Sequence, residues 1–498
     1  MKKLFRELKK KFPEEFFIEE EVLYAYSFDT SFFYSLPKAV FIPKEKNKLI
    51  DIVSLLLENK IPVTPRGKAT GRSGGCVPHP ESVVVSTERL KNKIEFFIED
   101  EILYLEPGFT IDEINEFLKN YGYFYPVDPA SSDIASIGGT VATNAGGPRA
   151  LRYGVTINYV NGLSVLISDG TVLNTRGLLK KNKLFYPVEK IFVGSEGTLG
   201  LITEIYLKVI RIPEYKKSIL IESEKKEILK ISKELIKKEN ITLCEIMEWE
   251  NKFLLWTEYI GKKEDVIQEI EKLKKTIKGN LILPFNQEEE EKILSLRKKY
   301  SNLMWNLKGR KKSIDVTVPV SKIDSLILFY EKLENKYKIK IIPYGHFGDG
   351  NIHTSIIFEK RENGKAEKMK REICEYVLDI GGTVTGEHGF GIKYIMYTKR
   401  FKEYEIMKKI KKALDPYDLF NPSKIEGEFK VNKYEPGENK KMCILCSLCN
   451  LYSDNYKKFL REDKGTRGEI FLSKIKGNLK ISKENKESLK YCPLGFEI

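Results

Sequence analysis

Long apolar runs are missing from this sequence. No stretch approaches the roughly 18 consecutive apolar residues that a membrane-spanning helix requires, so we expect no such helix. The opening residues, MKKLFRELKKKFPEEFF, also lack the apolar core of a signal peptide, and they predict an amphipathic helix instead. We therefore expect a cytoplasmic protein, with the inner face of the cytoplasmic membrane as the alternative location.

Histidine and cysteine are scarce as well, with four and seven residues in a chain of 498. Four of the seven cysteines lie close to the C-terminus, a distribution that is not typical of a disulfide framework. The chain is too long for a single hydrophobic core, so its length predicts two or three domains.

Positive charge exceeds negative charge, with 85 Lys and Arg against 71 Asp and Glu. Residues 430–498 alone contain 15 basic residues against 9 acidic ones. Such an excess can attract an anionic membrane surface, an acidic partner or nucleic acid. We favour solvated helix faces, because Lys and Glu interleave along segments such as KKEILKISKELIKKEN. No zinc-finger, RNP or helix-turn-helix signature supports nucleic acid.

The composition and the pattern of apolar residues change twice along the chain. Residues 37–211 are rich in Gly and β-branched residues and contain short predicted strands such as ESVVVST. From residue 212 to about residue 385, strands alternate with amphipathic helices, which predicts an antiparallel sheet with helices on one face. Residues 428–438 resemble a linker. The predicted domains are therefore 1–211, 212–427 and 428–498.

Two glycine-dense loops interrupt the first domain, PRGKATGRSGG (65–75) and PASSDIASIGGTVATNAGG (129–147). Dense Gly, Ser and Thr let backbone N–H groups approach a pyrophosphate. Neither loop matches G-x-x-x-x-G-K-[ST], nor G-x-G-x-x-G between a strand and a helix. Turns between strands also need Gly. Two such loops in one domain, with GSEGTLGLIT downstream, nevertheless favour a dinucleotide.

These loops and four further motifs resemble those of the FAD-linked oxidases of the vanillyl-alcohol oxidase type. The further motifs are RYG, YGHFGDGNIH, GGTVTGEHGFG and DPYDLFNPSKI. Within this family, the sequence is most similar to glycolate oxidase flavin subunits and to D-lactate and D-2-hydroxyglutarate dehydrogenases. The resemblance covers residues 20 to about 427. It implies an α+β fold, with a two-part FAD domain of PCMH type (about 37–211) and an antiparallel-sheet cap domain that carries the substrate site and returns to the flavin.

The resemblance also implies which residues line the FAD. One departure from the family is Lys68-Ala69, where small residues, mostly glycines, are usual. The matching positions are Arg66, Gly67, Thr70, Gly71, Ser73, Gly74, Gly75, Pro129, Ser136, Gly138, Gly139, Asn144, Gly146, Gly147, Gly197, Ile202 and Asn421.

Three of the four histidines fall in two Gly-flanked motifs, GHFGDGNIH and GEHGFG. Asp-Gly in the first motif predicts a two-residue hairpin loop, which would place His346 directly opposite His353 with Cβ atoms about 4.5–5.5 Å apart. Glu387 could add a carboxylate, and two His with one Glu is a set typical of Zn²⁺ or Mn²⁺. The alternative is a purely structural role for the histidines. The resemblance implies a divalent metal at these positions, so we favour the metal.

Oxidation of an α-hydroxy acid removes the hydroxyl proton and a hydride from Cα, and the proton needs a base near neutral pH. The resemblance implies that His388 is this base and that Arg297 binds the substrate carboxylate. A solvated helix face is the alternative for Arg297, which two lysines follow directly. Lys312 is a second candidate for the carboxylate, at a place where the alignment can slip by one residue.

The C-terminal cysteines form a C-x-x-C-x-x-C run and a separate Cys-Pro: Cys443, Cys446, Cys449 and Cys492. In two-cluster ferredoxins, each triplet takes its fourth ligand from the Cys-Pro of the other motif. The ligand positions of the second cluster hold, in order, Ser453, Ser482, Asn485 and Ser488. One ligand set is thus complete and the other is absent, which predicts a module with a single [4Fe–4S] cluster. A structural zinc site is less favoured, because zinc ribbons pair two C-x-x-C knuckles.

A flavin accepts two electrons, and a cluster passes them one at a time. We therefore expect a dehydrogenase that oxidises a small D-2-hydroxy acid, D-lactate or glycolate, and delivers electrons to a quinone, a cytochrome or a partner subunit. The alternatives are a D-2-hydroxyglutarate dehydrogenase, and a non-redox flavoenzyme of the same fold such as an alkyl-dihydroxyacetone-phosphate synthase, against which the cluster argues. A nucleic-acid-binding protein with a zinc module is a further alternative. We expect an iron–sulfur or quinone-reducing partner and no nucleic acid, and peripheral membrane association is compatible with the charge.

Overall fold

The computed structural model describes most of the chain. Four of the first five strands build a four-stranded sheet in the order β1-β3-β5-β4, in which β3, β5 and β4 run parallel. Its strands are β1 (Phe16–Phe17), β3 (Ala39–Phe41), β4 (Val63–Arg66) and β5 (Val83–Ser86). The residues described are 1–249, 252–284, 286, 288–289, 300, 309–427, 430–434, 450, 453–476 and 481–491.

Two helices cover this sheet, α1 (Lys2–Lys11) and α3 (Lys46–Glu58). The strands are buried on both sides, as short runs of Val and Ala predict for a parallel sheet. Phe5 and Leu8 of α1 are buried in the same core, which confirms the amphipathic helix expected at the N-terminus.

A second, antiparallel sheet of five strands follows, in the order β10-β9-β11-β7-β6. Helix α4 (Ile111–Lys119) begins at a capping box of Thr110 and Glu113, and it packs on this sheet with α5 (Ile137–Thr143). The strands are β6 (Ile94–Phe97), β7 (Ile102–Leu105), β9 (Val160–Leu166), β10 (Val172–Asn174) and β11 (Leu201–Lys208). Short elements beside them are α2 (Glu20–Ala25), α6 (Ala150–Tyr153), α7 (Glu189–Phe192), β8 (Tyr123–Phe124) and β12 (Ile210–Arg211).

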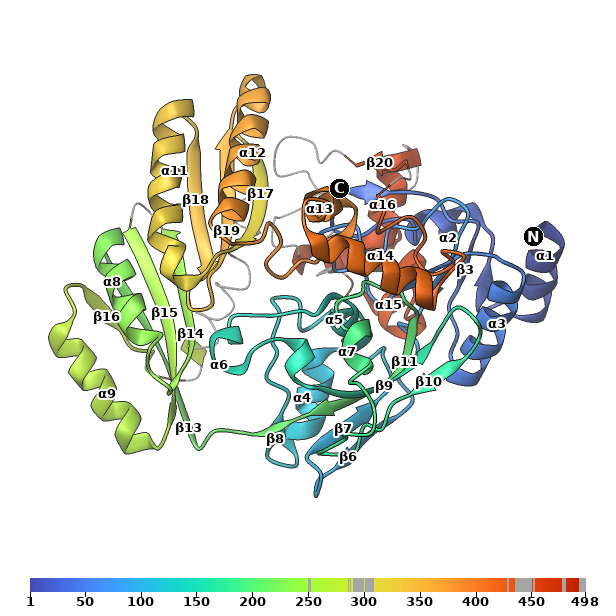
Figure 1. Cartoon of the computed structure of the whole chain (residues 1–498), viewed down its shortest axis with the longest axis horizontal. Coiled ribbons are helices and arrows are strands. Elements are labelled where there is room, and N and C mark those ends of the chain that lie inside the picture. The colour runs from blue at the N-terminus through green and yellow to red at the C-terminus, as the bar shows by residue number, and fades with distance from the viewer. Residues whose placement is uncertain are drawn as a thin grey trace.

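The middle of the chain forms an antiparallel sheet of seven strands, in the order β16-β13-β15-β14-β18-β19-β17. Four helices lie on one of its faces (Figure 1), which confirms the predicted arrangement of helices on one side of a sheet. The strands are β13 (Tyr215–Ser223), β14 (Ile241–Trp249), β15 (Lys252–Gly261), β16 (Asn280–Ile282), β17 (Arg310–Thr317), β18 (Lys340–His346) and β19 (Asn351–Phe358). The helices are α8 (Lys225–Leu235), α9 (Lys263–Thr276), α11 (Ile323–Tyr337) and α12 (Asn363–Asp379).

The other face of this sheet, which we call the open face, turns toward the N-terminal part. Arg149 at the start of α6 donates to both carboxylate oxygens of Glu258 on β15, each at 2.8 Å. The chain then returns through α13 (Gly391–Thr398) and α14 (Lys402–Leu414). Backbone bonds of 2.7 Å from Val63 to Leu419 and from Asn421 to Val63 attach the returning segment to β4.

The C-terminal segment packs against the N-terminal part. Residues 428–438 were expected to be a linker, but β20 (Asn432–Lys433) pairs antiparallel with β2 (Phe33–Tyr34). Helices α15 (Asp454–Phe459), α16 (Thr466–Lys476) and α17 (Lys483–Glu487) follow. Phe471 of α16 stacks on Phe28, with ring centroids 4.0 Å apart. Within the described ranges, none of the helices has the length and apolar character needed to cross a bilayer.

Candidate active site

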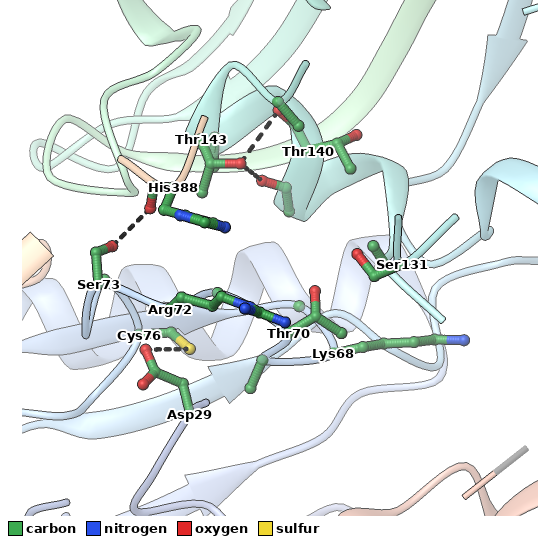
Figure 2. A pocket seen from close by; sticks show the side chains of 18 of the residues that line it. Asp29, Lys68, Thr70, Arg72, Ser73, Cys76, Ser131, Thr140, Thr143 and His388 are labelled. Atoms are coloured by element: carbon green, nitrogen blue, oxygen red, sulfur yellow. Dashed lines mark hydrogen bonds between the residues drawn. The ribbon is translucent and has the colours of Figure 1, made fainter. Parts of the chain in front are cut away.

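A cavity of about 620 Å³ lies between the two glycine-rich loops and the open face of the seven-stranded sheet. Residues 65–73 and 129–146 form much of its wall, and the open face contributes Ser313, Tyr344 and His353. Figure 2 shows His388 at this cavity, beside Ser73 of the first loop. The Ser73 hydroxyl donates to the backbone oxygen of His388 at 2.7 Å, which joins the first loop to the GEHGFG motif.

Most of the positions predicted to line the FAD do line this cavity. The exceptions are Gly74, Asn144, Gly147 and Asn421, and each of them shapes a loop instead. Asn144 ends α5 at φ 51° and accepts from the Ile157 N–H at 2.9 Å. Asn421 donates to the backbone oxygens of Gly75 and Glu196 at 2.7 and 2.8 Å.

The geometry of the loops fits FAD. A Cβ on Gly67 would lie 2.4 Å from Ser136 Oγ, and a Cβ on Gly138 would lie 2.5 Å from Pro107 Cβ, so only glycine permits these close approaches. The Ser136 hydroxyl is buried at the cavity and has no hydrogen-bond partner among the residues that the structure describes. A buried polar group of this kind calls for a ligand partner. The residues present therefore suit a large ligand with phosphate oxygens.

The three residues predicted to bind a metal meet at the cavity wall. The ligand atoms of His346, His353 and Glu387 all lie within 4.8 Å of one another. The Nε2 atoms of His346 and His353 are 3.5 and 3.4 Å from the Glu387 carboxylate oxygens. Ligands bound tetrahedrally at about 2.1 Å from one ion are roughly 3.4 Å apart. The triad therefore has the spacing of a metal site.

The hairpin that carries the two histidines differs from the prediction. His346 pairs with Asn351 and His353 pairs with Tyr344, so the connection has four residues and not two. The histidines are therefore diagonal neighbours, with ring centroids 5.1 Å apart, and not directly opposed. A shift by two residues keeps a side chain on the same face of a sheet. Both rings consequently still point to the open face.

Two carboxylates that the sequence analysis did not identify orient these rings. Glu245 of β14 forms a hydrogen bond with His346 Nδ1. Asp315 Oδ1 of β17 lies 3.2 Å from His353 Nδ1. Carboxylates behind metal-binding histidines set the tautomer and leave Nε2 for the metal. The only sequence signal was a lone acidic residue inside each apolar strand segment, TLCEIM and SIDVTV.

The electrostatics of the triad favour a cation. Burial raises the pKa of Glu387, but His346 and the two other histidines outweigh it and hold this pKa well below the usual value. Burial lowers the pKa of His353, which favours the neutral ring that metal binding needs. Burial also lowers the pKa of His346, but Glu245 and Glu387 outweigh it and raise this pKa well above the usual value. Burial also opposes ionisation of Asp315, yet His388 and His353 lower its pKa well below the ordinary range.

His388, the predicted base, lies next to the triad. Its Nδ1 atom is 2.7 Å from Asp315 Oδ2, and its Nε2 atom is 3.7 Å from Glu387 Oε1. Asp315 also accepts from the backbone N–H groups of Gly386 and Glu387 at 3.1 and 2.9 Å. A carboxylate at Nδ1 keeps the proton there and leaves Nε2 as the basic nitrogen.

Lys312, a predicted substrate contact, is placed away from the cavity. It lies on the helix side of β17, where its Nζ atom is 2.5 Å from Glu367 of α12. Alternate residues of a strand point to opposite faces, so Lys311 shares the open face with Ser313 and Asp315. Burial lowers the pKa of Lys311 well below its usual value, and Arg72 adds to this effect. The structure therefore places Lys312 on the helix side of the sheet and Lys311 on the open face, which borders the cavity.

Other predicted residues lie outside the described residues. These are Arg297 and the four cysteines Cys443, Cys446, Cys449 and Cys492. Three cations that were not predicted as site residues line the cavity, Lys68, Arg72 and Lys393. Burial, together with Lys370 and Arg72, lowers the pKa of Lys393 to about 7.

Comparisons with known proteins agree with this geometry. The family model described as FAD binding domain matches residues 37–176, and the model described as FAD linked oxidases, C-terminal domain, matches residues 219–425. Among solved structures, an alkyldihydroxyacetonephosphate synthase superposes with a TM-score of 0.68 at 17% identity, over 85% of this chain and 84% of that chain. This likeness confirms the predicted α+β fold of the vanillyl-alcohol oxidase type.

Curated relatives are similar over almost their entire length. The glycolate oxidase subunit GlcD of Bacillus subtilis is 31% identical, over 83% of this chain and 94% of that protein. A D-lactate dehydrogenase of Archaeoglobus fulgidus is 29% identical (80% and 95%), and a D-2-hydroxyglutarate dehydrogenase of Stutzerimonas stutzeri is 28% identical (83% and 96%). The chain is therefore a flavin-dependent oxidoreductase that belongs to the FAD-linked oxidase family.

Proposed function

We propose that this chain is a FAD-dependent dehydrogenase that oxidises a small D-2-hydroxy acid, D-lactate or glycolate, to the 2-oxo acid. The observation that carries the proposal is the pair His388 and Asp315, 2.7 Å apart, beside the triad of His346, His353 and Glu387. A base next to a metal triad at a flavin cavity is the machinery that removal of a hydroxyl proton requires. The relatives named for glycolate and D-lactate support this substrate class.

Each residue has a separate task in this proposal. His346, His353 and Glu387 would hold Zn²⁺ or Mn²⁺, which would supply Lewis-acid assistance at the substrate hydroxyl. FAD would supply the acceptor for the hydride from Cα. His388 takes the hydroxyl proton at Nε2, and Asp315 stabilises the resulting imidazolium because its carboxylate faces Nδ1.

The carboxylate of the substrate needs a cation. Arg72 and Lys393 line the cavity, Lys311 is half-buried and within electrostatic reach of Arg72, and Arg297 remains a predicted contact. Arg72, Lys393 and Lys311 together exceed the need of a monocarboxylate. This excess makes D-2-hydroxyglutarate, a dicarboxylate, the second candidate, and one relative is named for it.

We further propose that electrons leave through a single [4Fe–4S] cluster held by Cys443, Cys446, Cys449 and Cys492. The described residues support a ferredoxin-like origin of this segment. Ser453, Asn485 and Ser488 stand where ligands of a second cluster would lie, and they converge: Ser453 Oγ is 2.5 Å from Asn485 Oδ1. The Thr466 hydroxyl joins them, 2.5 Å from Ser488 Oγ and 3.2 Å from Asn485 Oδ1. All four are buried. A hydrogen-bonded cluster thus occupies this position.

The acceptor is proposed to be a quinone, a cytochrome or a partner subunit with iron–sulfur or quinone-reducing chemistry. A Lys-rich tail would suit a partner or membrane surface of opposite charge. Co-purification of the tagged protein from its own cells, with and without the C-terminal residues 428–498, tests the partner directly. Loss of a specific partner with the tail supports the proposal, and recovery of the same partner by both forms contradicts the role of the tail.

The substrate and the cluster are tested on anaerobically purified protein. D-lactate, L-lactate, glycolate, D-2-hydroxyglutarate and D-malate are screened for bleaching of the flavin, and we expect a D-2-hydroxy acid or glycolate to bleach it. Iron should amount to about four atoms per chain. Cys492→Ser should lose the cluster and transfer to an external acceptor, but keep bleaching by substrate. One zinc and no iron would contradict the cluster, and no bleaching by any 2-hydroxy acid would contradict the reaction.

A further inference from the structure

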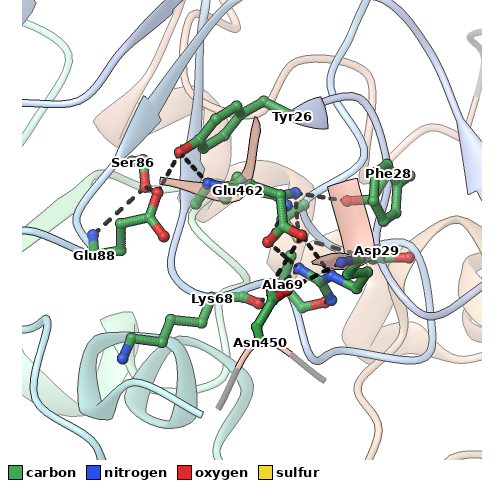
Figure 3. Close-up of polar contacts among 12 residues, drawn as sticks. Tyr26, Phe28, Asp29, Lys68, Ala69, Ser86, Glu88, Asn450 and Glu462 are labelled. Carbon is green, nitrogen blue, oxygen red and sulfur yellow. Dashed lines mark hydrogen bonds and ion pairs between the residues drawn. The ribbon is translucent and has the colours of Figure 1, made fainter. Parts of the chain in front are cut away.

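The C-terminal segment contacts the first glycine-rich loop, and Arg467 hydrogen-bonds to the backbone of that loop. Arg467, the second residue of α16, is fully buried and donates to the backbone oxygens of Lys68 and Ala69 at 3.3 and 3.2 Å. Figure 3 shows Lys68, Ala69, Asn450 and Glu462 gathered at this contact. Lys68 and Ala69 also line the cavity assigned to FAD.

We propose that Arg467 is a positioning residue for FAD: it sets the direction of the backbone N–H groups of the loop 68–72, although it lies outside the flavin domain. The inference requires FAD binding, which the family establishes, and it does not require the iron–sulfur cluster or any particular substrate.

The peptide groups of the loop are planar. In a trans peptide the C=O of one residue and the N–H of the next point in opposite directions. Arg467 holds the C=O groups of Lys68 and Ala69 away from the cavity, so the N–H groups of Ala69 and Thr70 face the other way. The next two oxygens are held by Thr30, whose hydroxyl can donate to the oxygen of Thr70 at 2.9 Å and whose backbone N–H donates to the oxygen of Gly71 at 3.0 Å. Successive N–H groups that face one concavity form a nest for phosphate oxygens.

Ala69 makes this support necessary. Its φ is +49°, in the left-handed region that favours glycine. A non-glycine residue in this region costs free energy, and surrounding contacts must hold it there. The contact with Arg467 is such a support, on the residue that carries the strain.

Arg467 is itself rigidly placed. Its Nε and Nη2 atoms donate to Glu462 at 2.8 and 2.5 Å, and its guanidinium lies 5.3 Å from the ring centroid of Phe28. Its backbone N–H donates to Asn450 Oδ1 at 3.0 Å. Bidentate, charge-assisted pairs have a well-defined geometry. The guanidinium therefore presents its remaining N–H groups to the loop in one orientation.

Glu462, the ion-pair partner of Arg467, also contacts the flavin domain. The backbone N–H of Glu462 donates to the Tyr26 hydroxyl at 3.0 Å, and Tyr26 donates to the buried Glu88 at 2.5 Å. Docking of the C-terminal segment and ordering of the loop are thus parts of one network. Because coupling between two binding events is reciprocal, FAD should also stabilise the docking of the C-terminal segment.

The test measures FAD affinity without turnover. The flavin is removed from full-length protein, and FAD is titrated back while its fluorescence is followed. Arg467→Gln loses charge-assisted contacts to the loop, so the Kd for FAD should rise by roughly 10- to 100-fold. The matched control is Tyr456→Phe, which removes a hydrogen bond of 3.1 Å from the C-terminal segment to Glu88; among the described residues, the Tyr456 hydroxyl has no hydrogen bond to the loop. Its Kd should change less than about threefold.

Two further variants separate positioning from loss of folding. The double variant Arg467→Gln with Glu462→Gln removes both charges of the pair. Its folded state should be destabilised less than that of the single variant, which leaves one buried charge without its partner. The double variant should still bind FAD weakly. Ala69→Gly accepts a positive φ without strain, so Arg467→Gln should weaken FAD binding less in this background. Wild-type affinity in the folded double variant, or an equal loss with and without Ala69→Gly, would overturn the proposal. These outcomes are independent of substrate and of iron.

Discussion

The Nδ1 atom of His388 lies 2.7 Å from Oδ2 of Asp315. The other oxygen of the same carboxylate lies 3.2 Å from Nδ1 of His353. One buried aspartate thus orients both the proposed base and one proposed metal ligand, and the two functions should fail together when it is changed.

Asp315→Asn tests this relationship. An amide cannot stabilise the imidazolium of His388, so kcat should fall by roughly 10- to 1,000-fold, within the range of general-base catalysis. Metal affinity should also fall by roughly 10- to 100-fold, because a carboxylate behind a metal-binding histidine is lost. Steady-state kinetics and metal analysis of the purified variant measure the two effects.

His388→Ala is the matched comparison: it should lower kcat by roughly 10²- to 10⁴-fold while metal and FAD are retained. A normal metal content in Asp315→Asn would contradict the double role.

Removal of the metal tests the triad of His346, His353 and Glu387. Treatment with a chelator should abolish oxidation of substrate while the flavin absorbance is kept, and Zn²⁺ or Mn²⁺ should restore the rate. His346→Ala should show the same loss without recovery on adding metal, because two ligands hold an ion weakly. Full activity of a protein shown by elemental analysis to be free of divalent metal would end this proposal.

Neighbouring lysines on β17 provide a matched pair for the substrate carboxylate. Lys311 is on the open face, whereas Lys312 pairs with Glu367 on the helix side. Lys311→Met should raise KM for the hydroxy acid by roughly tenfold or more, with a smaller change in kcat, since such a contact acts in ground and transition states alike. Lys312→Met should lose only a partly exposed ion pair, and change KM and stability little. The reverse order of effects would return the assignment to Lys312.

Glu196 predicts a pH dependence of stability. Burial raises the pKa of its carboxyl from 4.5 to about 7, although the Gly391 N–H, 3.0 Å away, opposes this shift. Between these pH values the folded state keeps a proton that the unfolded state has released. The contribution of this carboxyl to the free energy of unfolding is therefore fully present below the pKa of the unfolded state. It is lost as the pH rises through the pKa of the folded state, by up to about 3 kcal/mol.

Glu196→Gln keeps a carbonyl acceptor for Gly391 and removes the titration. The free energy of unfolding of the flavin-free protein, measured by urea titration from pH 5 to about pH 8, should fall less steeply with pH in the variant. Parallel curves for wild type and variant would show that this carboxyl is ionised throughout. The same residue is a pocket-lining group that the sequence analysis did not single out, although its motif GSEGTLG was noticed.

The order of strands and helices in the middle of the chain was readable from sequence, because apolar periodicity is a local property. The same periodicity placed His346 and His353 on one face. The register of the two strands did not follow from this periodicity. The hairpin loop has four residues where Asp-Gly suggested two, and the two histidines remain on one face because this difference is an even number of residues. The one-residue ambiguity at Lys311 and Lys312, in contrast, moves a charge to the opposite side of the sheet, and only strand pairing resolves it.

By itself, the sequence determined the family, the glycine loops, the histidine motifs and the four candidate cluster ligands, since these depend on residue types at short spacings. The tertiary structure decided which distant groups act together. Asp315 and Glu245 come from separate strands, and no local pattern marks them as partners of the histidines. Arg467 is 398 residues from Ala69 in the chain. Such contacts arise from the packing of whole elements, which brings together side chains that carry no signal for one another along the sequence.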